Sequence, residues 1–218
     1  MNASVVRAAL RPTARATPLL PAAAGALLGL MFVVSASGEN VVARLVAAAV
    51  LAAAGTGFAL DDPAALTLEA SPTPLAVRRS LRAALVFTMV GLAWSIDLVV
   101  AARFAPRGAS LPVDALTLEL SAFVAVVLAI SAAAARRSSD GRGGAIAAPA
   151  FVVLVFGTNV LAYLWPAFPG LLPHTPHHDR WIWVLVGATA LLGWLNRDPA
   201  TRSRPRHRRA RPRSDPMS

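Results

Sequence analysis

Long apolar runs alternate with short polar connections along this chain of 218 residues. A helix rises about 1.5 Å per residue, so five of the six runs reach about 27 Å or more, close to the roughly 30 Å hydrocarbon core of a bilayer. They do not alternate polar and apolar residues as the strands of a membrane barrel do. The pattern predicts an all-α, polytopic integral membrane protein with six transmembrane helices. The runs are roughly Leu19–Ala36, Val41–Leu60, Leu81–Ala102, Leu111–Ala135, Ala145–Ala167 and Trp181–Asn196.

Composition agrees with this prediction. Hydrophobic residues make up 56% of the chain and charged residues only 15%, whereas soluble domains carry about 25% charged residues. There is no cysteine, which excludes disulfides, thiolate catalysis and cysteine-based metal sites.

The basic residues, all of them arginine, are distributed unevenly between the two ends of the predicted helices. Most precede the first run, flank the second-to-third and fourth-to-fifth connections, or follow the last run. The opposite side has only Arg44, Arg103, Arg107 and Arg180. Because cytoplasmic loops carry the excess of basic residues, both termini are expected in the cytoplasm of a cell that holds this protein in its plasma membrane.

Three parts follow from this topology. Residues 1–18 form a cytoplasmic segment, residues 19–196 the six-helix transmembrane domain, and residues 197–218 a basic cytoplasmic tail expected to be disordered. Residues 1–36 also have the layout of a cleaved signal peptide, which would leave five spans. We favour retention, because the run is long and spaces Gly25 and Gly29 as G-x-x-x-G, a pattern suited to close helix contact.

One connection stands out, "DDPAALTLEASPTPLAVRR" after the second run. Asp62 can cap a new helix with Pro63 at its first position, so we expect a short cytoplasmic helix at about 63–70. A helix this short is marginal alone and needs the membrane, the rest of the chain or a partner to hold it.

The layout resembles the membrane subunit of ABC-type exporters with six spans and both termini inside. In that family the connection between the second and third spans carries a coupling helix that rests on a separate ATP-hydrolysing subunit. The apolar outer loop "LWPAFPGLLPHTPHHDR" is also similar in kind. The resemblance implies a non-catalytic transport subunit that acts as a dimer with an ATP-binding partner docked under residues 61–80. The residues expected to dock are Asp61, Asp62, Pro63, Glu69, Arg78 and Arg79.

Five polar residues of the predicted spans, all in the outer half of the bilayer, are candidates for a site: Arg44, Asp97, Glu119, Asn159 and Tyr163. Ionisable residues inside a membrane are expensive and face the protein interior or a cavity. Arg44 could instead extend outward to the headgroups, but Glu119 lies too deep for that. We therefore expect Glu119 to be protonated, to face the interior or to pair with Arg44. We predict an intramembrane polar cluster of these five residues, in which Arg44, Asp97 and Glu119 line a vestibule or fix the register of the helices.

The remaining motifs indicate neither a catalytic residue nor a cofactor. There is no phosphate-binding G-x-x-x-x-G-K-[ST] loop, and "GRGG" at 141–144 is interpreted as a turn. His174, His177, His178 and Asp179 lack the spacing of a standard metal site. The arginine-rich tail is expected to meet anionic lipid rather than nucleic acid, because it has no aromatic residues to stack on bases.

Two other functions stay open. The chain could be a membrane scaffold or accessory protein that transports nothing, or a proton-coupled secondary transporter that uses Glu119 or Asp97 as its carboxylate.

Overall fold

The computed structural model describes residues 17–61, 75–106, 110–138, 142–164 and 178–196. In these residues the chain is all-α, as predicted, with six α-helices and two 3-10 turns. In order they are α2 (Leu20–Val34), η1 (Gly38–Asn40), α3 (Val41–Thr56), η2 (Gly57–Leu60), α4 (Leu75–Phe104), α5 (Val113–Arg137), α6 (Gly144–Leu164) and α7 (His178–Leu195).

Each predicted run corresponds to one helix, with shifted ends. The third helix begins six residues earlier than predicted, at Leu75, and so also includes Arg78 and Arg79. Four stretches are long and apolar enough to cross a membrane: Val41–Leu60, Ala76–Phe104, Val113–Arg137 and Gly144–Leu161. The helix α2 and the apolar part of α7 are shorter. The four candidate spans indicate a multi-pass membrane protein.

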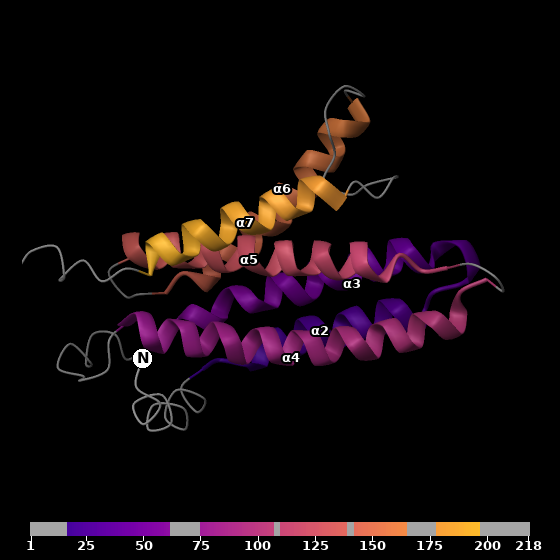
Figure 1. Cartoon of the computed structure of the whole chain (residues 1–218), viewed down its shortest axis with the longest axis horizontal. Coiled ribbons are helices and arrows are strands. Elements are labelled where there is room, and N and C mark those ends of the chain that lie inside the picture. Colours follow the sequence, from indigo (N-terminus) through magenta and orange to yellow (C-terminus); the bar gives the residue numbers. More distant parts are fainter. Residues whose placement is uncertain (1–16, 62–74, 107–109, 139–141, 165–177, 197–218) are drawn as a thin grey trace, which may run out of the picture.

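The helices α3 and α5 lie at the centre of the bundle. α2 and α4 pack against α3, α6 and α7 pack against α5, and α3 and α5 contact each other. The most apolar stretch of α5 is 72% buried, whereas those of α4 and α6 are 22% buried. Figure 1 shows that α6 diverges from the bundle toward its C-terminal end.

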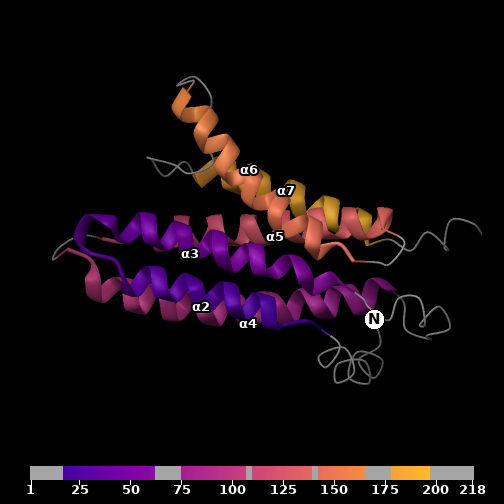
Figure 2. The ribbon, with the colours of Figure 1, turned by 180° about the vertical axis from the view of Figure 1, so that it is seen from behind.

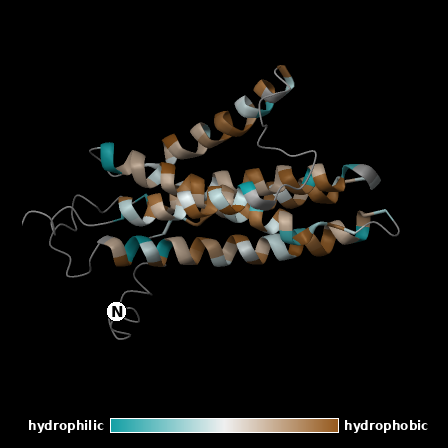
Figure 3. Cartoon of the chain, turned by 45° about the horizontal axis from the view of Figure 1, so that its top comes forward, coloured by the Kyte–Doolittle hydropathy of each residue, from teal (hydrophilic) through white to brown (hydrophobic). Residues whose placement is uncertain are grey.

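The outer surface of the bundle is apolar. Large side chains stand exposed on α2, α4 and α6, among them Met31, Leu92, Val153 and Phe156. Figure 3 shows hydrophobic residues on all of these helices. Contiguous exposed apolar surface of this extent is exceptional in a soluble monomer and is suited to lipid.

Glycines allow α2 and α3 to lie very close together. A Cβ on Gly25 would collide with the carbonyl group of Leu51, and one on Gly29 would lie 3.1 Å from the Cα of Ala48. On the facing helix, a Cβ on Gly55 would lie 2.5 Å from the carbonyl oxygen of Pro21. The predicted close helix contact at Gly25 and Gly29 is confirmed.

The helix α3 ends in a tightened turn. The hydroxyl of Thr56 donates to the carbonyl of Ala53 (2.6 Å), and the chain continues through η2, whose Ala59 and Leu60 are buried. This turn contacts both α5 and α6 and brings Asp61 to the start of α6.

Candidate functional site

One end of the bundle is rich in arginine. α3 and α5 end there and α4 and α6 begin there, so segments that are far apart in the sequence meet. We call it the arginine-rich end, and its described arginines are Arg78, Arg79, Arg82, Arg136, Arg137 and Arg142.

Asp61 is bound to two other segments at the arginine-rich end. Its Oδ1 accepts hydrogen bonds from the backbone N–H groups of Gly143 (2.6 Å) and Gly144 (2.7 Å). Its carbonyl oxygen accepts a hydrogen bond from Nη1 of Arg82 (2.8 Å). The first N–H groups of a helix have no partner within the helix, and a carboxylate there also interacts favourably with the helix dipole. Asp61 therefore caps α6 from 82 residues away.

Close packing holds the capped end of α6 in place. The hydroxyl of Ser131 donates to the carbonyl of Gly57 (2.7 Å) and ties η2 to α5. A Cβ on Gly143 would collide with the carbonyl of Ser131, and one on Gly144 would lie 2.6 Å from the Cα of Phe58. Because the backbones approach so closely, only glycine fits at both positions. Gly143 and Gly144 of the "GRGG" motif thus donate their backbone N–H groups to an intrachain carboxylate.

The predicted docking residues lie partly outside the described residues. Asp62, Pro63, Glu69 and the expected short helix at about 63–70 fall in the segment that is not described. Arg78 is half-buried and Arg79 is buried near the start of α4. Their role in docking stays a prediction, while the hydrogen bond from Arg82 to the carbonyl of Asp61 ties α4 to the residue before the 62–74 connection.

Two carboxylates are buried in the other half of the bundle. Asp97 is 2% exposed and Glu119 is 3% exposed. Asp97 continues the inward-facing stripe of α4 formed by Val86, Val90 and Trp94, at helical spacing. Trp94 packs in the core, and its Nε1 donates to Oγ1 of Thr117 on α5 (3.1 Å). Sequence reasoning expected Glu119 to face the interior, to be protonated or to pair with Arg44, and the structure shows its side chain buried in the interior.

The basic residue that interacts electrostatically with Glu119 is Arg180, near the start of α7. The guanidinium of Arg180 lies 5.2 Å from the ring centroid of Trp181, and that ring packs edge-on against Phe123 at 5.1 Å. The guanidinium of Arg44 lies over Phe32, 5.5 Å from its centroid. Sequence reasoning missed Arg180 as a partner, because its distance from Glu119 along the chain gave no signal.

Asn159 and Tyr163 are the other two residues of the expected cluster, and both lie on α6. Nδ2 of Asn159 donates to the carbonyl of Val155 in its own helix (2.6 Å). Tyr163 is 87% exposed, on the part of α6 that diverges from the bundle. A single site formed by all five predicted residues stays a prediction.

The pairing of Glu119 can be measured with a double-mutant cycle. We expect Glu119→Gln and Arg180→Gln to be coupled by about 1 kcal/mol or more in the free energy of unfolding, because the effects of two charges that influence each other are non-additive. The measurement is unfolding in mixed detergent micelles. The matched cycle with Arg44→Gln should show additivity, and coupling of Glu119 to Arg44 instead would contradict the assignment.

No group of three or more potential metal ligands occurs among the described residues. The loop with His174 and His177 lies outside them, as do the side chains of His178 and Asp179. Comparison of the chain with protein-family models, with curated proteins and with solved structures finds no match.

Proposed function

We propose that the chain is the non-catalytic transmembrane subunit of an ABC-type transporter, with a separate ATP-hydrolysing subunit bound beneath residues 61–80. In this proposal all six helices cross the plasma membrane. The arginine-rich end faces the cytoplasm, as the excess of basic residues favours.

The observation that supports docking is the double attachment of Asp61. Its backbone is held by Arg82 of α4 and its carboxylate by the amides of α6. The 62–74 connection therefore begins at a residue that is hydrogen-bonded to the start of α6 and to Arg82 of α4. A partner that displaces this connection would act on both helices, which is what a coupling element requires.

The second observation that supports docking is the burial of two arginines near the start of α4. Arg79 is 9% exposed and Arg82 is 3% exposed, so the start of α4 is packed into the protein instead of extending into solvent. The connection thus has a fixed base, and a rigid base lowers the entropic cost of binding a partner.

The test replaces residues 62–74 with a Gly/Ser linker of equal length and leaves Asp61 and Arg82 in place. We expect the native chain to co-purify from mild detergent with an ATPase and to stimulate its ATP hydrolysis, and the linker variant to lose both properties. The control replaces residues 107–109, at the opposite end, in the same way. A partner without ATPase activity would favour the scaffold function, and unchanged co-purification of the linker variant would contradict docking here.

A proton-coupled carrier is the second candidate, favoured by the burial of Asp97 and Glu119 within the membrane-spanning part. Such a carrier works without a partner. Transport by the chain alone in vesicles should then be retained when residues 62–74 are replaced by the linker and be lost in Glu119→Gln. An ABC-type subunit should instead lose its function with the linker and keep it in Glu119→Gln.

A further inference from the structure

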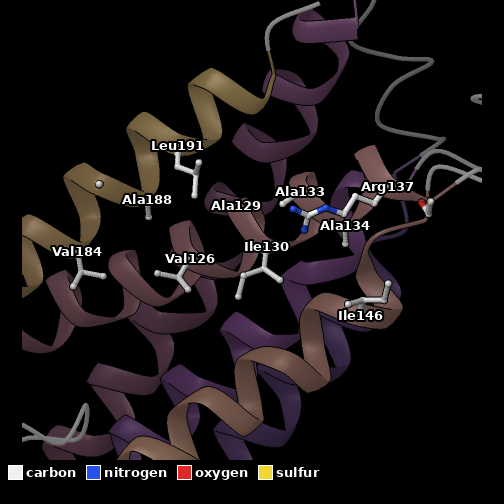
Figure 4. Close-up of a pocket in the computed structure, with 12 residues that line it drawn as sticks. Val126, Ala129, Ile130, Ala133, Ala134, Arg137, Ile146, Val184, Ala188 and Leu191 are labelled. Atoms are coloured by element: carbon white, nitrogen blue, oxygen red, sulfur yellow. The ribbon is translucent and has the colours of Figure 1, made fainter. Parts of the chain in front are cut away.

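An apolar groove lies between α5, α6 and α7 toward the arginine-rich end. Its volume is about 560 Å³, within the range of about 300–1,000 Å³ for small-molecule sites. Figure 4 shows side chains of all three helices around it. Ten of its twelve lining residues are aliphatic or glycine, and the other two are Arg137 and Ser138.

The groove forms because small residues line the space between α6 and α7. α6 and α7 both pack on α5, and α5 presents Ala129 and Ala133 between them, while α7 presents Gly187 and Ala188. A Cβ on Gly187 would meet nothing within 4 Å. The missing side-chain volume leaves a hollow that opens on the apolar outer surface.

The groove has one polar end. Along α5 it runs from Val126 to Arg137, about 16 Å at the rise of a helix. Ser138 and Arg137 lie where α5 ends, at the level where a membrane-spanning helix meets the headgroups. The rest of the lining lies deeper and is apolar. A phospholipid likewise has a polar headgroup at one end and apolar acyl chains along the rest of its length.

The charge at this mouth is positive. Arg137 is exposed, and Arg136 and Arg142 lie in the neighbouring turns, Arg136 over the ring of Trp194 (5.7 Å). Asp61 is the acidic residue that the described part of the chain places at this end, and its Oδ1 is held by Gly143 and Gly144. Basic pockets between membrane helices bind anionic headgroups.

We propose that this groove binds an anionic phospholipid, with one acyl chain along Ile130 and Leu191 and the phosphate at Arg137. The site differs from attraction of the basic tail to the bilayer surface, because it holds a single lipid molecule in a defined place. It does not depend on the proposed transport function.

The test measures lipid bound to the full-length protein by native mass spectrometry, with phosphatidylglycerol or phosphatidylcholine added to the detergent-purified chain. We expect one retained phosphatidylglycerol, bound more tightly than phosphatidylcholine. Arg137→Ala should weaken phosphatidylglycerol binding about fivefold, which is the contribution of one arginine near anionic lipid. It should also remove the preference for phosphatidylglycerol over phosphatidylcholine. Gly187→Leu should fill the groove and abolish retention of both lipids.

The controls are Arg103→Ala, an exposed arginine at the opposite end, and Gly91→Leu, an open glycine outside the groove. Both should bind as the native chain does, and every variant keeps the basic tail. Equal binding of the two lipids by the native chain, or full retention in Gly187→Leu, would overturn the proposal. The proposal would also be overturned if inorganic phosphate alone stabilised the protein against thermal unfolding as much as phosphatidylglycerol does, because phosphate binding needs no groove.

A second copy of the chain is the competing occupant. Because the native chain has no cysteine, Ala188→Cys introduces a single thiol at the groove. We expect no disulfide-linked dimer to form at this thiol under oxidation in liposomes. Rapid disulfide-linked dimers would show that another chain covers the groove and would overturn lipid binding there.

Discussion

Gly55→Leu is expected to separate α2 from α3 and to lower the free energy of unfolding by about 3 kcal/mol or more. Overpacking a well-packed site costs about 1–3 kcal/mol when side chains can adjust. Here the obstacle is backbone, because a Cβ on Gly55 would lie 2.5 Å from the carbonyl oxygen of Pro21 and 2.9 Å from the Cα of Ala22. The helices would have to move apart along their whole contact.

The membrane makes this contact more important. Lipid tails are as apolar as leucine, so close packing, rather than escape from water, holds membrane helices together. Gly25 and Gly29 on α2 face the same contact, so separation at Gly55 also removes their packing. The loss should therefore exceed that of a single side chain.

Unfolding in mixed detergent micelles measures this effect. Gly91→Leu is the matched control, since a Cβ on Gly91 of α4 would meet nothing within 4 Å, and it should change the stability by less than about 0.5 kcal/mol. Equal stabilities of the Gly55 and Gly91 variants would show that α2 and α3 are not held by this contact.

Asp61→Ala is expected to destabilise the protein by about 2–4 kcal/mol. The substitution removes the acceptor of two backbone N–H groups on buried glycines. Each buried donor left without a partner costs about 1–3 kcal/mol, and the favourable interaction with the dipole of α6 is lost as well.

Asp61→Asn separates the hydrogen bonds from the charge. Its amide oxygen can still accept from Gly143 and Gly144, so we expect a smaller loss, about 1 kcal/mol, the difference between charged and neutral acceptors. Asp114→Ala, on an exposed aspartate in the first turn of α5, is the control for removal of a carboxylate near a helix start.

Hydrogen exchange provides a local readout of the same change. The amides of Gly143 and Gly144 should exchange faster in Asp61→Ala than in the native chain, while those of α2 stay protected. Unchanged exchange at these two glycines would contradict the cap.

The residues also explain how far the sequence could predict this site. The aspartates after the second run could be identified as a helix-start signal, because a carboxylate is unfavourable at a helix C-terminus. The expected helix after Asp62 lies outside the described residues and stays a prediction, whereas the structure shows that Asp61 caps α6. Local reasoning could not find this second role, because α6 begins at Gly144, 83 residues further along the chain.

The burial of Glu119 was predictable and its partner was not. Its depth in an apolar helix already indicated an inward position. Arg44 was the expected partner because both residues lie in the outer half of the bilayer. The packing of α7 against α5 places Arg180 within electrostatic influence of Glu119, and rotation about a helix axis depends on packing with every neighbour.

The sequence by itself determined the helices, their apolar character and the suitability of α2 for close helix contact. These properties depend on hydropathy, length and glycine spacing within neighbouring segments. The tertiary structure alone decided that Asp61 caps α6, that Arg180 interacts with Glu119 and that a groove opens beside Arg137. Each of these brings together residues from separate helices, and their meeting depends on how the helices are rotated and tilted against one another. No local pattern along the chain contains that information.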